Sequence, residues 1–234
     1  MYGSILAEIH ARWFSAIAES AARHIQKEAS SLVPFDLADL GCGSGVLCSL
    51  LREQSRSIYG IDRSPEMIAR CRMLIPSARF ETGDILDADI PDSDVVVMAG
   101  EILSYAMSGE ERTDADLERF FRMVHDHLRP NGLFLFDVLG PHDYAGKFLH
   151  EHPEYTIFSH VTAHHDIVTR TITSFLRRGD GYEKSVEVHR LRQFDPAALT
   201  SLLTRIGFTV RPLTHFDTTP VLPGRLAFEC RIAQ

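Results

Sequence analysis

The stretch that decides the fold is Asp39-Leu40-Gly41-Cys42-Gly43-Ser44-Gly45, which follows and overlaps a short apolar run at residues 37–40. Glycine adopts positive φ without strain, and it lets another molecule approach the main chain because it carries no Cβ. Three alternating glycines at the end of a buried strand therefore predict a sharp turn into a helix over about residues 45–52, with a ligand against bare backbone.

An acidic residue follows at the end of the next apolar run. Asp62 comes directly after residues 57–61. A carboxylate there lies across the mouth of the first strand-to-helix turn, where it is placed to accept both hydroxyls of a ribose. Together, the glycine turn and Asp62 predict a nucleoside-containing cofactor on a parallel sheet.

The third glycine distinguishes between cofactors. The dinucleotide fingerprint G-x-G-x-x-G would need glycine where the chain has Val46, and no P-loop Gly-Lys-Ser or Gly-Lys-Thr occurs. A G-x-G-x-G turn preceded by an acid resembles the first motif of the class I S-adenosylmethionine-dependent methyltransferases. The resemblance implies that S-adenosylmethionine lies with its amino-acid tail along Asp39, Gly41, Cys42 and Gly43. The alternative is an ordinary tight loop.

Composition favours a small-molecule enzyme. The 234 residues are 44% hydrophobic, which fits one domain with a full core. The net charge of −8 weighs against a nucleic-acid partner, because phosphate binding needs clustered Lys and Arg. No apolar run is long enough to span a membrane and no signal peptide is evident, so we expect a cytoplasmic protein without a membrane partner. The oligomeric state is left open.

Alternating strand and helix patterns predict a doubly wound, Rossmann-like α/β sheet. A helix is expected over residues 5–28, and a later helix, 196–206, precedes two strands joined without a helix, which should run antiparallel. A sheet that ends in such a reversed C-terminal strand resembles the methyltransferase sheet. The seven expected strands are residues 37–40, 57–61, 78–81, 94–99, 133–138, 208–210 and 226–232.

Residues 141–194 are too many for a plain connection. They predict an antiparallel β lid with strands at 155–162, 167–176 and 182–194, the last two joined by a hairpin containing Asp180-Gly181. Residues 1–140 and 195–234 would then form the cofactor-binding domain. Arginines gather in this insertion, and we expect them to be solvent-exposed on a hairpin rather than to form an anion site: Arg170, Arg177, Arg178, Arg190 and Arg192.

Further cofactor contacts are expected after strands three and four. The family resemblance implies that Asp84 accepts from the adenine amino group, that the Ile85 N–H meets the ring, and that Met67 packs on the adenine face. Ala99 and Gly100 would let the methionine portion approach the backbone. The alternatives are that Asp84 caps a turn and that Met67 is ordinary core.

Candidate catalytic residues follow strand four and lie on the lid. Glu101 and Tyr105 are four apart and would share a helix face. On the lid, His189 would act as a base and shares a strand face with Glu187. The alternatives are a helix N-terminal acid for Glu101 and a structural hydrogen bond for His189.

Two further patterns carry weaker interpretations. The run Ala163-His164-His165-Asp166 lacks a third spaced ligand, so we interpret it as a hairpin turn and expect no metal site. His10 and Trp13 on the first helix would close over the cofactor, although Trp13 also fits a core anchor.

The resemblance spans nearly the whole chain and is to a bacterial branch of small-molecule class I methyltransferases. It implies methyl transfer from S-adenosylmethionine to nitrogen or oxygen of a small metabolite, with S-adenosylhomocysteine as product. Glu101 departs from the asparagine of glycine N-methyltransferase relatives, which puts an amino-acid substrate in doubt. The alternatives are a tRNA or protein methyltransferase, a non-catalytic S-adenosylmethionine-binding module, and, more distantly, a nicotinamide oxidoreductase.

Overall fold

The computed structural model describes residues 4–13, 15–109 and 111–232. It opens with two helices, α1 (Ser4–Trp13) and α2 (Ala16–Glu28), so the prediction of one helix over residues 5–28 is wrong. The two helices follow different surfaces. Ile9 of α1 packs with Tyr155 and Leu176 of a second sheet, whereas α2 packs on the main sheet. One straight helix could not follow both surfaces.

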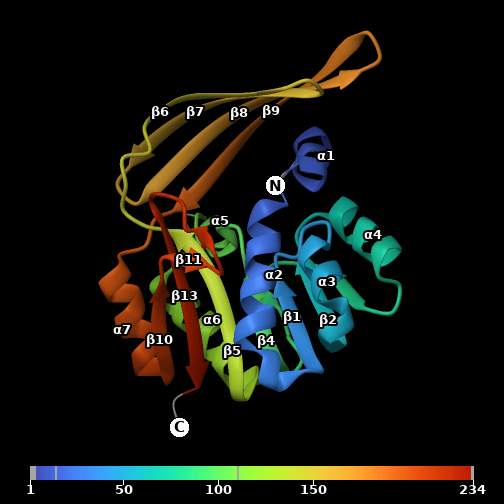
Figure 1. The fold of residues 1–234 in the computed structure, drawn as a ribbon. Helices are drawn as coiled ribbons and strands as arrows, with labels where there is room; N and C mark the ends of the chain where they lie inside the picture. Colours follow the sequence, from blue (N-terminus) through green and yellow to red (C-terminus); the bar gives the residue numbers. More distant parts are fainter. Residues whose placement is uncertain (1–3, 14, 110, 233–234) are drawn as a thin grey trace.

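A seven-stranded sheet forms the centre of the molecule, in the order β10-β13-β5-β4-β1-β2-β3 (Figure 1). Strands β1 to β5 run parallel, and β13 lies antiparallel between β5 and β10. The predicted doubly wound fold with a reversed C-terminal strand is therefore confirmed. The strands are β1 (Phe35–Leu40), β2 (Ser55–Asp62), β3 (Arg79–Thr82), β4 (Ser93–Met98), β5 (Leu128–Leu139), β10 (Phe208–Leu213) and β13 (Arg225–Ile232).

Helices cover both faces of this sheet. On β4, Val95 and Val97 pack with α2, α3 and α4, while Val96 and Met98 pack on the opposite side with α5, α6 and α7. Burial on both faces explains why this strand has a continuous apolar sequence. The helices are α3 (Val46–Leu51), α4 (Pro65–Leu74), α5 (Ile102–Ala106), α6 (Asp114–His127) and α7 (Pro196–Ile206), with 3-10 turns η1 (Ser30–Leu32), η2 (Arg52–Gln54) and η3 (Ile85–Asp87).

A separate antiparallel sheet, β6-β7-β8-β9, follows β5 and arches over one end of the molecule, above α1 and α5 (Figure 1). It has four strands rather than the three predicted: β6 (Gly146–His152), β7 (Tyr155–His164), β8 (Ile167–Arg178) and β9 (Gly181–Arg192). The missed strand, β6, is almost wholly exposed. Its apolar residues Phe148 and Leu149 are adjacent and point to opposite faces, so its sequence lacks the alternation that marks a half-buried strand. Both predicted hairpin turns are confirmed, with His165 at φ 53° between β7 and β8.

Two smaller observations complete the fold. Among the described residues, no helix is both long enough and apolar enough to cross a membrane. The side chains of His10 and Trp13 lie outside the described residues, so their predicted closure over the cofactor stays a prediction.

Candidate functional site

A cavity of about 740 Å³ opens at the carboxyl ends of β1, β2, β4 and β5, on the side of the β6–β9 sheet. The start of α2 and the hairpin of β11 (His215–Phe216) and β12 (Thr219–Pro220) also line it. Of the residues predicted for the site, all except Asp84 line this cavity: Asp39, Gly41, Cys42, Gly43, Asp62, Met67, Ile85, Ala99, Gly100, Glu101, Tyr105 and His189.

Two glycines give the cavity a wall of bare main chain. Gly43 has φ 53° and Gly100 has φ 102°, and a Cβ built on either would meet no atom within 4 Å. Their missing side chains are therefore not required by packing against the protein. What they leave open is space for a ligand to contact the backbone, as the sequence predicted.

Asp62 lies at the edge of the glycine turn. Its two carboxylate oxygens accept hydrogen bonds from the backbone N–H groups of Gly43, at 3.0 Å, and Ser64, at 2.8 Å. Burial raises the pKa of Asp62, and those two hydrogen bonds oppose the rise. Each oxygen keeps a further lone pair, so the carboxylate can still accept from ligand hydroxyls while it holds the turn in place.

Asp39 is the buried acid at the base of the turn. Burial raises its pKa to about 7, and the Asp62 charge adds to that effect. The Cys48 thiol donates a hydrogen bond of 3.2 Å to Asp39, which acts in the opposite direction. Asp39 therefore changes charge near neutral pH, at the wall of the cavity.

Met67 and Ile85, both buried, form an apolar part of the wall. Asp84 lies outside it. One of its oxygens accepts from Arg63 at 2.6 Å and from Arg112 at 2.8 Å, and the other accepts from the Leu86 N–H at the start of η3. These contacts match the turn-capping alternative, and the adenine contact that the resemblance implied stays a prediction.

A chain of buried charges crosses the other end of the cavity. Arg170 of β8 forms two hydrogen bonds with Glu101, at 2.8 and 3.2 Å, and Arg225 of β13 approaches the same carboxylate at 3.1 Å. Arg225 also contacts Asp137 of β5 at 3.1 Å, and Asp137 accepts from the Gly100 N–H at 2.6 Å. One network of ion pairs and hydrogen bonds therefore joins the β6–β9 sheet to β5, to β13 and to the residues that follow β4.

These charges decide the ionisation of Glu101. Burial would raise its pKa, but the charges of Arg170 and Arg225 outweigh burial and hold the pKa below its usual range. Glu101 thus stays a carboxylate. Burial raises the pKa of Asp137 to about 6, against the opposing charge of Arg225.

Sequence reasoning missed Arg170, Arg225 and Asp137. Arg170 was expected on an exposed hairpin face, and that expectation is wrong, because its side chain is only 22% exposed and faces Glu101. Strand alternation places Arg170 on the same face as the buried Val168, which is the one signal that pointed inward. Arg225 follows an irregular loop and carried no such signal.

Tyr105 and His189 come together although they are far apart in the chain. The Tyr105 hydroxyl lies 3.3 Å from His189 Nδ1, and His189 Nε2 lies 3.1 Å from Glu187. His189 is buried at 3% exposure. The predicted pairing of Glu187 and His189 on one strand face is confirmed.

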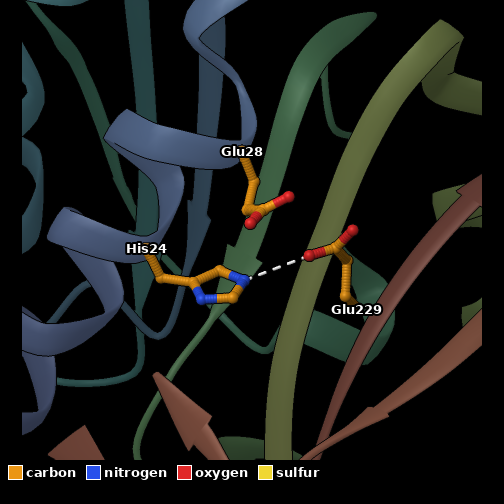
Figure 2. Close-up of side chains that lie close together, drawn as sticks. All are labelled: His24, Glu28 and Glu229. Carbon is orange, nitrogen blue, oxygen red and sulfur yellow. Dashed lines mark hydrogen bonds and ion pairs between the residues drawn. The ribbon is translucent and has the colours of Figure 1, made fainter. Parts of the chain in front are cut away.

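A second polar cluster lies away from this cavity. Figure 2 shows His24 and Glu28 of α2 pointing toward Glu229 of β13, with His24 Nε2 at 3.0 Å from Glu229. The Asp217 N–H donates to His24 Nδ1, so the neutral ring carries its proton on Nε2 and has no lone pair for a metal there. Burial opposes ionisation of Glu229, but hydrogen bonds from His24 and Arg211 lower its pKa to about 2. The cluster fits a buried hydrogen bond from His24 to Glu229 that ties α2 to β13.

Comparison with known proteins gives a consistent result. Residues 37–132 match the family described as a methyltransferase domain. YqeM of Bacillus subtilis (strain 168), provisionally named a methyltransferase, is 27% identical over 198 residues, covering 79% of this chain and 78% of YqeM. An S-adenosylmethionine-dependent methyltransferase from Clostridium acetobutylicum ATCC 824 aligns with a TM-score of 0.85 at 20% identity, over 98% of both chains. CalS10, an amino pentose methyltransferase from Micromonospora echinaspora, aligns with a TM-score of 0.77 at 19% identity, over 100% of this chain and 98% of CalS10.

Residues 37–132 therefore match a methyltransferase domain, and the whole chain shares the fold of a solved S-adenosylmethionine-dependent methyltransferase. The cavity fits that cofactor. The open space at Gly43 and Gly100 accepts a ligand against the main chain, Asp62 offers acceptors for hydroxyl groups, and Met67 and Ile85 offer an apolar wall for a base.

Proposed function

We propose that this enzyme transfers the methyl group to nitrogen or oxygen of a small metabolite. In this proposal residues 141–194 are the substrate-binding lid of a cofactor domain formed by residues 1–140 and 195–234. The observation that carries it is the shared cavity, in which the glycine turn lies at one end and lid residues Arg170 and His189 line the other. CalS10, a methyltransferase of an amino pentose, offers a parallel for a small acceptor on this fold.

In this proposal one end of the cavity binds the cofactor and the other end binds the methyl acceptor. Bound S-adenosylmethionine supplies a methyl group on a sulfonium. Asp39, Asp62 and the glycine turn would hold the amino-acid tail and the ribose, and the lid would exclude water and align the acceptor. In-line displacement depends chiefly on that alignment, so extensive acid–base machinery is not required.

Glu101 has an electrostatic role in this proposal. Because Arg170 and Arg225 hold it ionised, it is a poor proton acceptor. Its negative charge lies beside Gly100, where it would orient the acceptor and offset positive charge near the sulfonium. The ion pairs of Glu101 thus favour charge stabilisation over proton removal as its role.

A macromolecular acceptor is the alternative. The lid sheet contributes to the cavity wall, which leaves a space of small-molecule size, and the net charge of −8 disfavours a polyanion. Release of S-adenosylhomocysteine against separate panels of small amines and alcohols, bulk tRNA, and unfolded protein tests the two. We expect turnover with a small acceptor and little dependence on salt. Turnover only with tRNA or protein would overturn the proposal.

The same assay separates catalysis from ligand binding. Glu101→Gln and Tyr105→Phe should lose turnover by different amounts, while calorimetry reports whether each still binds S-adenosylhomocysteine. A variant that binds normally but turns over slowly places its residue at the acceptor.

A further inference from the structure

Three polar side chains form a line from the cavity into the lid. Tyr105 of α5 contacts His189 of β9 both through its hydroxyl, at 3.3 Å, and through an edge-on ring contact with centroids 5.6 Å apart. His189 then contacts Glu187 at 3.1 Å. The side chains of His189 and Glu187 are only 2% and 10% exposed, so their hydrogen bonds are shielded from water.

Glu187 sets the direction of the hydrogen bonds. A carboxylate can only accept, so His189 Nε2 carries a proton and donates a hydrogen bond to Glu187. In the neutral ring Nδ1 is then the acceptor, and the Tyr105 hydroxyl donates to it. Arg170 lies directly opposite His189 in the β8–β9 pairing.

We propose that Glu187 is a positioning residue that holds His189 in the tautomer able to take a proton from the methyl acceptor through Tyr105. This inference rests on the proposed function. As the acceptor atom bonds to the methyl carbon, the carbon–sulfur bond breaks and its electron pair stays on sulfur. The acceptor proton passes to the Tyr105 oxygen, and the Tyr105 proton passes to His189 Nδ1. The imidazolium that forms is stabilised by the Glu187 carboxylate.

A proton relay restricts the kind of methyl acceptor that the enzyme can use. A proton relay serves an acceptor that carries a proton to lose, such as a hydroxyl group or an ammonium. It offers nothing to a carboxylate or a thioether, which reacts through a lone pair already free. The charges facing His189 from neighbouring elements are Glu187 on its own strand and Arg170 on β8, with Glu101 and Arg225 behind Arg170.

Glu187→Gln tests the role. A carboxylate can only accept from Nε2–H, whereas a glutamine amide can either accept from Nε2–H or donate to Nε2, so the fixed preference for the proton on Nε2 is lost. A ring with its proton on Nδ1 cannot accept from Tyr105. Long-range proton–nitrogen NMR of His189 reads the tautomer without turnover, in the presence of S-adenosylhomocysteine. We expect Nε2–H in the native protein and in Glu187→Asp, and a detectable population of Nδ1–H in Glu187→Gln.

Turnover is the second readout, with the acceptor found by the panel of amines and alcohols. Glu187→Gln should lower kcat by about 10- to 100-fold with KM nearly unchanged. The acid limb of its pH–rate profile should also move to lower pH, because the imidazolium has lost its carboxylate. Glu187→Asp should restore most of kcat. Glu183→Gln, on the exposed part of the same strand, is the matched control and should behave as the native protein.

The positioning role of Glu187 and the proposed function can fail separately. A native tautomer, kcat and pH profile in Glu187→Gln would overturn the positioning role. A lower kcat with an unmoved pH profile and an unchanged tautomer would also overturn it, since that pattern indicates a purely structural effect. If the native enzyme releases no S-adenosylhomocysteine with any acceptor, the proposed function fails, and the NMR spectra still decide whether Glu187 fixes the ring.

Discussion

The two sheets of this molecule contribute to the site by different physical means. The seven-stranded sheet is buried on both faces and presents main chain to the cavity, at Gly43 and Gly100. The β6–β9 sheet buries one face and leaves apolar side chains such as Phe158 and Val188 exposed on the other. It presents side chains to the cavity, chiefly Arg170 and His189.

Because one sheet presents main chain and the other presents side chains, the two sheets differ in how they can recognise a ligand. Backbone geometry depends on the packing of the whole core, so a cofactor bound to main chain is recognised by a rigid surface. Side chains on a half-buried sheet can be exchanged without moving the backbone. Side chains of the β6–β9 sheet can therefore vary while the backbone of the seven-stranded sheet is kept.

The ion pairs of Glu101 join the seven-stranded sheet to the β6–β9 sheet, and breaking them should cause the largest loss of stability. Glu101→Gln would leave Arg170 and Arg225 buried without their shared carboxylate. We expect the free energy of unfolding, measured by urea denaturation, to fall by about 3 kcal/mol. A loss below about 1 kcal/mol would mean that the lid is held independently of this network.

Asp62→Ala tests the cofactor half alone. It removes the acceptor for ligand hydroxyls and releases the Gly43 N–H, so affinity for S-adenosylmethionine should fall about 100-fold, or roughly 2.7 kcal/mol. Isothermal titration calorimetry measures the effect. Asp62→Asn keeps one acceptor oxygen and should lose less affinity. Equal affinity in the native protein and both variants would contradict a contact between Asp62 and the ligand hydroxyls.

Asp39 should make cofactor binding depend on pH. With a pKa of about 7, Asp39 is largely protonated at pH 6 and ionised at pH 8. A ligand ammonium favours the ionised form, so affinity should rise about tenfold over that interval in the native protein and stay flat in Asp39→Asn.

The same residue should affect stability in the opposite direction. An acid whose pKa is raised on folding costs stability as pH rises from near 4, and the cost is complete above pH 7. Asp39→Asn should therefore be more stable than the native protein at pH 8, by about 4 kcal/mol, and similar to it at pH 4. Lower stability of the variant at pH 8 would contradict the buried-acid interpretation.

The exposed contacts of the lid should have the smallest effect. Arg178 at the lid tip forms ion pairs with Glu8 of α1 and with Glu183, in contact with solvent. Arg178→Ala should change Tm by no more than about 2 °C and leave cofactor affinity unchanged. A larger change would show that the lid tip, and not only the buried network, fixes the sheet over the cavity.

Local signals placed the glycine turn after β1 and Asp62 at the end of β2, as the structure has them. Both lie within a few residues of a strand end, where local geometry decides their position. Prediction from the sequence failed where contacts between residues distant in the chain determine the structure. The first helix divides in two because its halves pack on different sheets, and β6 forms although its sequence has no apolar face.

The sequence by itself determined the parallel sheet, the reversed last strand and the glycine turn after β1, because apolar periodicity and glycine positions act over short distances. Only the tertiary structure decided which charges meet. Arg170, Arg225 and Glu187 reach the site from strands distant in sequence, and whether such a side chain faces solvent or a buried carboxylate is set by packing between the two sheets. The charges of Arg170 and Arg225 then outweigh burial and keep Glu101 ionised.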